Sequence, residues 1–307
     1  GERRVPAAIG VLVAPWSRRD LLISALGAAA GLAFPRPGAG VAADTSLRLP
    51  AAPAGRLKQS VSRWPFREIP LPELCRAART MGLVGIDLLH REDWGRVQDL
   101  GLVCSMGYPT SRREFIETGF GDRANHPMLL RELEAAIPLA ARHGVPNIIA
   151  MFGNRRGTRD AEAVESCVAG LTAVTALAEE SRVTICLELL NSKVDHADYQ
   201  GDSTGFGVQV VSAVGSSRVK LLYDIYHMQI MEGDVIRTIR ENITHIAHFH
   251  TAGVPGRNEL DQTQELNYGA IARAIADSGF DGYLAHEFIP TRNPLTSLRE
   301  AVAVCRV

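Results

Sequence analysis

The sequence predicts a parallel (β/α)8 barrel, the TIM barrel fold, in a single domain covering residues 56–307. From about residue 56, short runs of apolar and β-branched residues alternate with longer amphipathic segments, and eight such pairs are present. This alternation is typical of a parallel sheet with helices outside it, and about 250 residues is the usual length of a closed barrel. An open doubly wound sheet is the alternative, but no glycine-rich phosphate fingerprint follows any predicted strand.

The element boundaries follow from local signals along the chain. The strands are expected to begin near Leu57, Val84, Leu102, Asn147, Val183, Val219, His245 and Gly282. The helices are expected to begin near Leu71, Glu92, Pro127, Asp160, Gly205, Val235, Tyr268 and Pro294. The run His143–Pro146 has glycine at a helix end and proline just beyond it, which marks the entry to the fourth strand. Asp277–Gly282 carries a similar glycine-rich signal before the eighth strand.

Each of the last four predicted strands has a polar residue at or next to its end: Glu188, Asp224, His250 and Glu287. Taken singly, each could cap a helix or form an ion pair. Because the carboxyl ends of barrel strands meet at one rim, we expect all four side chains to converge there. Three carboxylates and one imidazole suit Mn²⁺, Mg²⁺ or Co²⁺ better than a cysteine-rich zinc site. The sequence therefore predicts one divalent metal ion, with Mn²⁺ the favoured species.

Other polar residues near these strand ends are candidates for substrate binding. His227 follows Asp224 by three residues, and Arg257 and Glu259 lie in a predicted rim loop, so all three are expected to contact substrate. For Arg257, an ion pair that organises the loop is an equal alternative. His245 and His248 are expected to be structural. Three long loops on the same rim, 107–125, 191–203 and 251–267, are expected to form the substrate pocket or a lid.

Charge and cysteine content exclude several classes of protein. The net charge is −1, and without residues 1–43 the remainder holds 28 basic and 32 acidic residues. We therefore expect no nucleic-acid partner, because nucleic-acid binding normally needs a concentrated basic surface. The five cysteines are scattered without a CxxC pair and are expected to be buried core thiols.

Residues 1–43 differ in composition from the rest. Ser17-Arg-Arg-Asp-Leu-Leu22 resembles a twin-arginine export signal, an apolar stretch follows, and Val41–Ala43 offers small residues for cleavage. The segment is interpreted as a signal and linker, disordered or cleaved, with no stable membrane insertion after cleavage. A periplasmic or exported location is expected, or a cytoplasmic one if the segment is not a working signal.

Six strings in the second half of the chain resemble hydroxypyruvate isomerases, a branch of the xylose-isomerase-like barrels. They are Glu188–Asn191 (ELLN), Tyr223–Gln229 (YDIYHMQ), His248–His250 (HFH), Pro255–Arg257 (PGR), Glu265–Tyr268 (ELNY) and Glu287–Phe288 (EF). The resemblance implies that the four strand-end residues bind the metal and that Glu188 and Glu287 are also the catalytic acid/base pair. Hydroxypyruvate isomerases often carry Gln at the position of His250, whereas the epimerases of this group carry His.

The resulting functional prediction is a divalent-metal-dependent isomerase acting on a small keto acid or sugar. Proton transfer of the aldose–ketose type would pass through an enediolate whose charge the metal ion offsets. A ketose 3-epimerase or a keto-sugar dehydratase or lyase of the same fold is the alternative. A non-catalytic periplasmic sugar-binding protein is a further one, and a homo-oligomer is possible in each case.

Overall fold

Eight short runs of mostly buried residues form one parallel sheet in the computed structural model, which describes residues 55–307. The strands are β1 Lys58–Ser62, β2 Gly85–Asp87, β3 Val103–Cys104, β4 Asn147–Ala150, β5 Thr184–Glu188, β6 Val219–Asp224, β7 Ile246–Thr251 and β8 Tyr283–His286. Their order is β3-β2-β1-β8-β7-β6-β5-β4. Gly107, just beyond β3, closes the barrel, because its N–H donates to the carbonyl of Asn147 and its own carbonyl accepts from Ile149.

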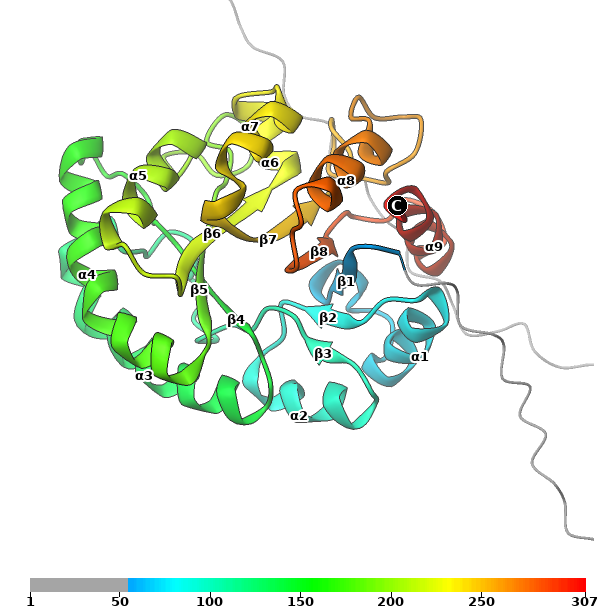
Figure 1. Ribbon diagram of the computed structural model, residues 1–307, viewed down its shortest axis with the longest axis horizontal. Helices are drawn as coiled ribbons and strands as arrows, with labels where there is room; N and C mark the ends of the chain where they lie inside the picture. Colours follow the sequence, from blue (N-terminus) through cyan, green and yellow to red (C-terminus); the bar gives the residue numbers. More distant parts are fainter. Residues whose placement is uncertain (1–54) are drawn as a thin grey trace, which may run out of the picture. The chain divides into compact units, whose positions relative to one another are not determined.

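Helices surround the strands as an outer ring (Figure 1). They are α1 Leu71–Met81, α2 Arg91–Asp99, α3 His126–Arg142, α4 Asp160–Ser181, α5 Thr204–Val214, α6 Ile225–Met231, α7 Val235–Asn242, α8 Tyr268–Asp277 and α9 Pro294–Val304. Residues 55–307 also contain three short 3-10 helices: η1 Trp64–Phe66, η2 Arg123–Asn125 and η3 Ile243–His245.

The predicted barrel is confirmed, and each expected element begins within one residue of the observed one. The extra helix α6 was not predicted. It follows β6 without a linker, because Asp224 both ends the strand and caps the helix by accepting from the N–H of His227 at 3.2 Å. The prediction of an export signal falls on residues outside those described.

The barrel interior near the carboxyl rim is polar. Asp87 on β2 reaches His250 on β7, and Ser105 beyond β3 reaches Ser60 on β1. Neither pair lies on neighbouring strands, so these side chains meet through the interior of the barrel. The apolar core therefore lies mainly between the sheet and the helices. The five cysteines are buried as free thiols, as predicted.

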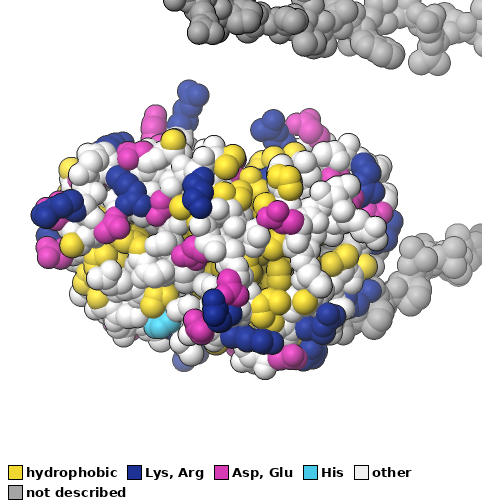
Figure 2. Space-filling model, turned by 90° about the horizontal axis from the view of Figure 1, so that it is seen from above, with side chains coloured by type: hydrophobic (Ala, Val, Ile, Leu, Met, Phe, Trp, Pro, Cys, Tyr) yellow, Lys and Arg dark blue, Asp and Glu magenta, His cyan; other side chains and the backbone are white. Residues whose placement is uncertain are grey.

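The surface shown in Figure 2 carries basic and acidic side chains interspersed with apolar ones. Charges of one sign do not gather into a stripe on this face. Surfaces that bind nucleic acid through its phosphates concentrate Lys and Arg instead.

The long loop after β3 rests directly on the loop after β4. The N–H groups of Phe120 and Gly121 donate to the carbonyls of Met151 and Phe152 at 3.0 and 2.8 Å. A Cβ on Gly119 would lie 2.2 Å from the backbone nitrogen of Gly153. Only glycine permits this backbone approach, which holds one rim loop against another.

We therefore expect Gly119→Ala to destabilise the protein by roughly 1–3 kcal/mol, because backbone would have to move to make room. Gly205→Ala is the matched control, since Gly205 lies in the first turn of α5 with no atom within 4 Å of an added Cβ. It should stabilise the protein by up to about 1 kcal/mol. Urea unfolding of both variants provides the measurement, and equal effects would contradict the inferred contact.

Candidate active site

The four predicted strand-end residues meet in one buried cluster at the carboxyl rim. Glu188 and Asp224 are the last residues of β5 and β6, His250 is next to last in β7, and Glu287 directly follows β8. Each contributes one atom to a group in which all atoms lie within 4.8 Å of one another. None of the four side chains is more than slightly exposed. The predicted convergence is therefore present in the fold.

His250 lies at the centre of this cluster. Its Nδ1 is 3.2 Å from Glu188 Oε1, 3.1 Å from Glu287 Oε2 and 3.8 Å from Asp224 Oδ2. The nitrogen is nevertheless not aligned for a hydrogen bond with any of these oxygens. On the other side of the ring, Nε2 lies 2.9 Å from Asp87 Oδ2 in hydrogen-bond geometry.

The cluster perturbs the acidity of its members. Burial by itself would lower the pKa of His250, but the carboxylates of Glu287, Asp87 and Glu188 raise it well above its ordinary value. Burial, followed by the charge of Glu287, raises the pKa of Asp224 to about 7. Burial would also raise the pKa of Glu287, but His250 and then Arg257 lower it well below its ordinary value. Such mutual perturbation is characteristic of functional sites.

These residues fit a divalent cation. Three carboxylates in a buried site repel one another unless a positive charge lies between them. The unpartnered Nδ1 of His250 faces the same space as their oxygens. An oxygen-rich donor set with one imidazole suits Mn²⁺, Mg²⁺ or Co²⁺.

Arg257 and Trp64 hold the carboxylate of Glu287. Arg257 Nη2 lies 2.6 Å from Oε2, and Trp64 Nε1 donates to Oε1 at 2.7 Å. The guanidinium also lies over the rings of Trp64 and Tyr226, 5.2 and 5.5 Å from their centroids. Arg257 adopts a left-handed backbone conformation with φ of 59°, which is uncommon for a non-glycine residue. Arg257 is thus tied to the cluster as well as to the cavity described below.

The ring of His227 lies next to the carboxylate of Asp224. Its Nδ1 accepts from the backbone N–H of Asn191 at 3.1 Å, so Nε2 carries the proton of the neutral ring. Nε2 lies 3.7 Å from Asp224 Oδ2 without a hydrogen-bond partner. The ring is fully buried. It is therefore placed to position Asp224 and does not line the cavity.

Glu259 is not brought to the cluster. Its carboxylate accepts from the backbone N–H groups of Thr291 and Arg292 and from the hydroxyls of Thr291 and Ser297, at 2.8–3.2 Å. It thereby fastens the loop after β7 to the segment that leads into α9. The substrate contact expected for Glu259 has no counterpart in this geometry.

A cavity of about 550 Å³ adjoins the cluster. Glu188 and Glu287 line it, whereas Asp224 and His250 do not. Each of the three long rim loops contributes to its wall, which agrees with their predicted role. Other lining residues are Arg63, Trp64, Arg67, Leu88, His90, Tyr108, Thr110, Ser111, Arg112, Arg113, Phe115, Ile116, Ile149, Met151, Leu190, His196 and Arg257.

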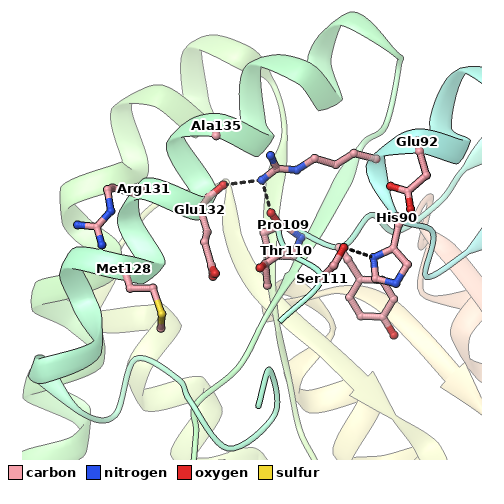
Figure 3. A pocket seen from close by; sticks show the side chains of 11 residues that line it. His90, Glu92, Pro109, Thr110, Ser111, Met128, Arg131, Glu132 and Ala135 are labelled. Carbon is pink, nitrogen blue, oxygen red and sulfur yellow. Dashed lines mark hydrogen bonds between the residues drawn. The ribbon is translucent and has the colours of Figure 1, made fainter. Parts of the chain in front are cut away.

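A second hollow of about 390 Å³ lies beside this cavity (Figure 3). His90, Tyr108, Thr110 and Ser111 line both spaces and form the wall between them. The rings of His90 and Tyr108 are stacked with centroids 4.9 Å apart, and Ser111 Oγ lies 3.3 Å from His90 Nδ1. These contacts fix the wall on the α2 and α3 side of the cavity.

Two residues of the site were missed by the sequence analysis. Asp87 ends the predicted second strand, so the strand-end pattern that identified the other carboxylates could have identified it too. Trp64 gave no such signal, because it lies in a short 3-10 helix and reaches Glu287 only through the closure of the barrel.

The chain is similar in sequence to known isomerases. It is 28% identical over 242 residues to a putative hydroxypyruvate isomerase of Homo sapiens, covering 76% of this chain and 80% of that protein. It is 32% identical over 114 residues to the hydroxypyruvate isomerase of Escherichia coli strain K12, covering 36% of this chain and 44% of that protein.

A solved structure of a 3-keto-D-glucoside 4-epimerase from E. coli shares the fold, with a TM-score of 0.68 and 18% identity. It covers 81% of this chain and 99% of that one. These three proteins are named as isomerases and an epimerase, and the chain is an enzyme of the isomerase class. The family model for the xylose isomerase-like TIM barrel matches residues 71–306. The chain therefore belongs to the xylose isomerase-like TIM barrel family.

Proposed function

We propose that this enzyme is a divalent-metal-dependent isomerase that moves a proton between neighbouring carbons of a small keto acid or ketose. One observation carries the proposal: of the four clustered residues, only the two glutamates also line the cavity. Glu188 and Glu287 can therefore reach both an ion and a substrate. Asp224 and His250 do not line the cavity, so they would bind the ion but not the substrate.

The residues of the cluster and of the cavity wall would have different roles. Glu188, Asp224, His250 and Glu287 would hold the ion, which when bound supplies a Lewis acid that offsets negative charge on substrate oxygens. One of the two glutamates takes the proton next to the substrate carbonyl and the other returns it. Arg257 lines the cavity beside Glu287 and orients the substrate, and His227 orients Asp224.

A ketose epimerase is the second candidate. The cavity of about 550 Å³ lies in the range of roughly 300–1,000 Å³ that encloses drug-sized ligands. It therefore has room for a hexose as well as for a three-carbon keto acid. Epimerisation needs the same two glutamates, with the proton returned to the opposite face of the same carbon. Export of the enzyme by the twin-arginine route stays a prediction from residues 1–43.

Glu188→Gln and Glu287→Gln should each lower the rate of proton transfer by roughly 10²–10⁴-fold, because each removes one acid/base group. NMR would follow the entry of solvent deuterium into keto acids and ketoses in the presence of Mn²⁺. Glu265→Gln is the control, since Glu265 is exposed and does not line the cavity. Full exchange rates in both cavity variants would contradict the assignment.

Asp224→Asn should abolish stabilisation by Mn²⁺ while making the metal-free protein more stable. The amide removes a buried charge that Glu188 and Glu287 repel, and it can still cap α6. At an ion concentration 100 times Kd, the wild type should gain about 2.7 kcal/mol. Thermal unfolding with and without Mn²⁺ is the measurement. A variant that keeps the Mn²⁺-dependent gain would show that Asp224 is not a ligand.

The affinity for Mn²⁺ should fall about tenfold per pH unit for each proton that the ion displaces, and below pH 7 both Asp224 and His250 hold such a proton. Above pH 7 this carboxyl is already ionised in the metal-free protein, so the dependence on pH should become shallower. Above pH 7 the ion must still displace a proton from His250, because the raised pKa of this ring keeps it protonated. Calorimetric titration between pH 6 and pH 8 tests this, and a constant affinity would contradict it.

A further inference from the structure

Asp87 has no role in the function proposed above, yet it occupies the centre of the barrel interior. It ends β2, and its side chain is fully buried. Oδ2 lies 2.9 Å from His250 Nε2, and Ser105 Oγ donates to Oδ1 at 2.7 Å. Ser62 Oγ donates to Oδ2 at 3.3 Å, and His248 Nε2 lies 3.0 Å from Oδ1. Residues on or beside three other strands, β1, β3 and β7, therefore surround one carboxylate.

This arrangement determines where the proton of neutral His250 resides. A neutral imidazole has one N–H donor and one lone pair, and an ionised carboxylate can only accept. Because Nε2 faces Asp87 at hydrogen-bond distance, Nε2 carries the proton. The lone pair is then on Nδ1, which faces Glu188, Asp224 and Glu287.

We propose that Asp87 is a positioning residue of this site: it fixes the tautomer and the orientation of His250 so that Nδ1 serves as a ligand. The proposal rests on the metal site proposed above. A carboxylate partner also makes the ligating nitrogen more basic, and loss of such a partner typically weakens metal affinity roughly 10–100-fold.

The backbone beside Asp87 agrees with a specialised role. Leu88, the next residue, adopts a left-handed conformation with φ of 52° although it is buried and not glycine. Conformations of this kind cost about 1–3 kcal/mol and persist where the surroundings enforce them. Here the chain turns sharply directly after the carboxylate, and Leu88 itself lines the cavity.

Asp87, His248 and His250 could in principle hold an ion of their own, because their donor atoms also lie within 4.8 Å of one another. Two ions, one on each nitrogen of His250, would require the ring to lose both protons. The hydroxyls of Ser105 and Ser62 already donate to the carboxylate, which supplies neutral partners in place of a cation. The geometry therefore favours a hydrogen-bonded support over a second metal site.

Asp87→Asn is the direct test. The amide nitrogen can donate to Nε2, which moves the ring proton to Nδ1 and blocks it as a ligand. Calorimetry should show Mn²⁺ binding weakened at least tenfold, with one ion per chain in the wild type. Nitrogen-15 spectra of the Mg²⁺-loaded wild type should show a proton on Nε2 of His250, and this signature should be lost in the variant.

Gln59→Met is the matched control. Gln59 is buried in the same barrel, and its Oε1 accepts a hydrogen bond from His286 Nε2 at 2.8 Å, a contact outside the metal cluster. It should lower stability without changing the Kd for Mn²⁺. If Asp87→Asn does not fold, Ser105→Ala replaces it, because it removes one donor to the carboxylate and should weaken Mn²⁺ binding at least threefold.

The outcomes separate the two proposals. A wild type that binds no divalent ion would overturn the proposed function and the role of Asp87 with it. A wild type that binds Mn²⁺, together with an Asp87→Asn variant of equal affinity and unchanged spectra, would overturn only the positioning role. Two ions per wild-type chain and one per Asp87→Asn chain would instead make Asp87 a ligand.

Discussion

The repulsion among three buried carboxylates is the constraint on which the rest of the rim depends. Their oxygens lie around one histidine nitrogen in a region with almost no access to water. Charges of one sign at such distances are costly to bury without a cation. Groups outside the cluster hold two of its members, Glu287 and His250. Trp64 and Arg257 bind the two oxygens of Glu287, and Asp87 binds the far side of His250.

The parallel barrel makes this arrangement possible. Glu188 and Asp224 terminate hydrogen-bonded strands, so the strand ladder fixes their Cα positions, and their side chains have little freedom to move apart. A hydrogen-bonded network around Asp87, rather than apolar side chains alone, fills part of the barrel interior. The hydrogen bonds from Ser105, Ser62 and His250 fix the Asp87 carboxylate, and a support fixed in this way preserves the geometry of the cluster.

Two members of the cluster line the cavity and two do not, and this difference matters for the chemistry of the site. His250 is closed off from the cavity, whereas Glu188 and Glu287 belong to its wall. A site that must bind an ion and also move a proton needs ligands of both kinds. The rim loops complete the cavity and determine its shape, through contacts as specific as that of Gly119 with the backbone of Gly153. Differences in substrate among barrels of this kind would arise in such loops.

The amino-acid sequence was enough to predict the eight β/α units and the four strand-end residues, because hydrophobic periodicity and strand spacing are local properties of the chain. It did not determine the partners of those residues. Asp87 meets His250 across 163 positions and Trp64 meets Glu287 across 223, contacts that exist only once the barrel closes. The same holds for Glu259, which sequence placed near substrate but which the fold turns towards α9. Local pattern fixes where a side chain leaves its strand, and only the closed barrel decides what that side chain touches.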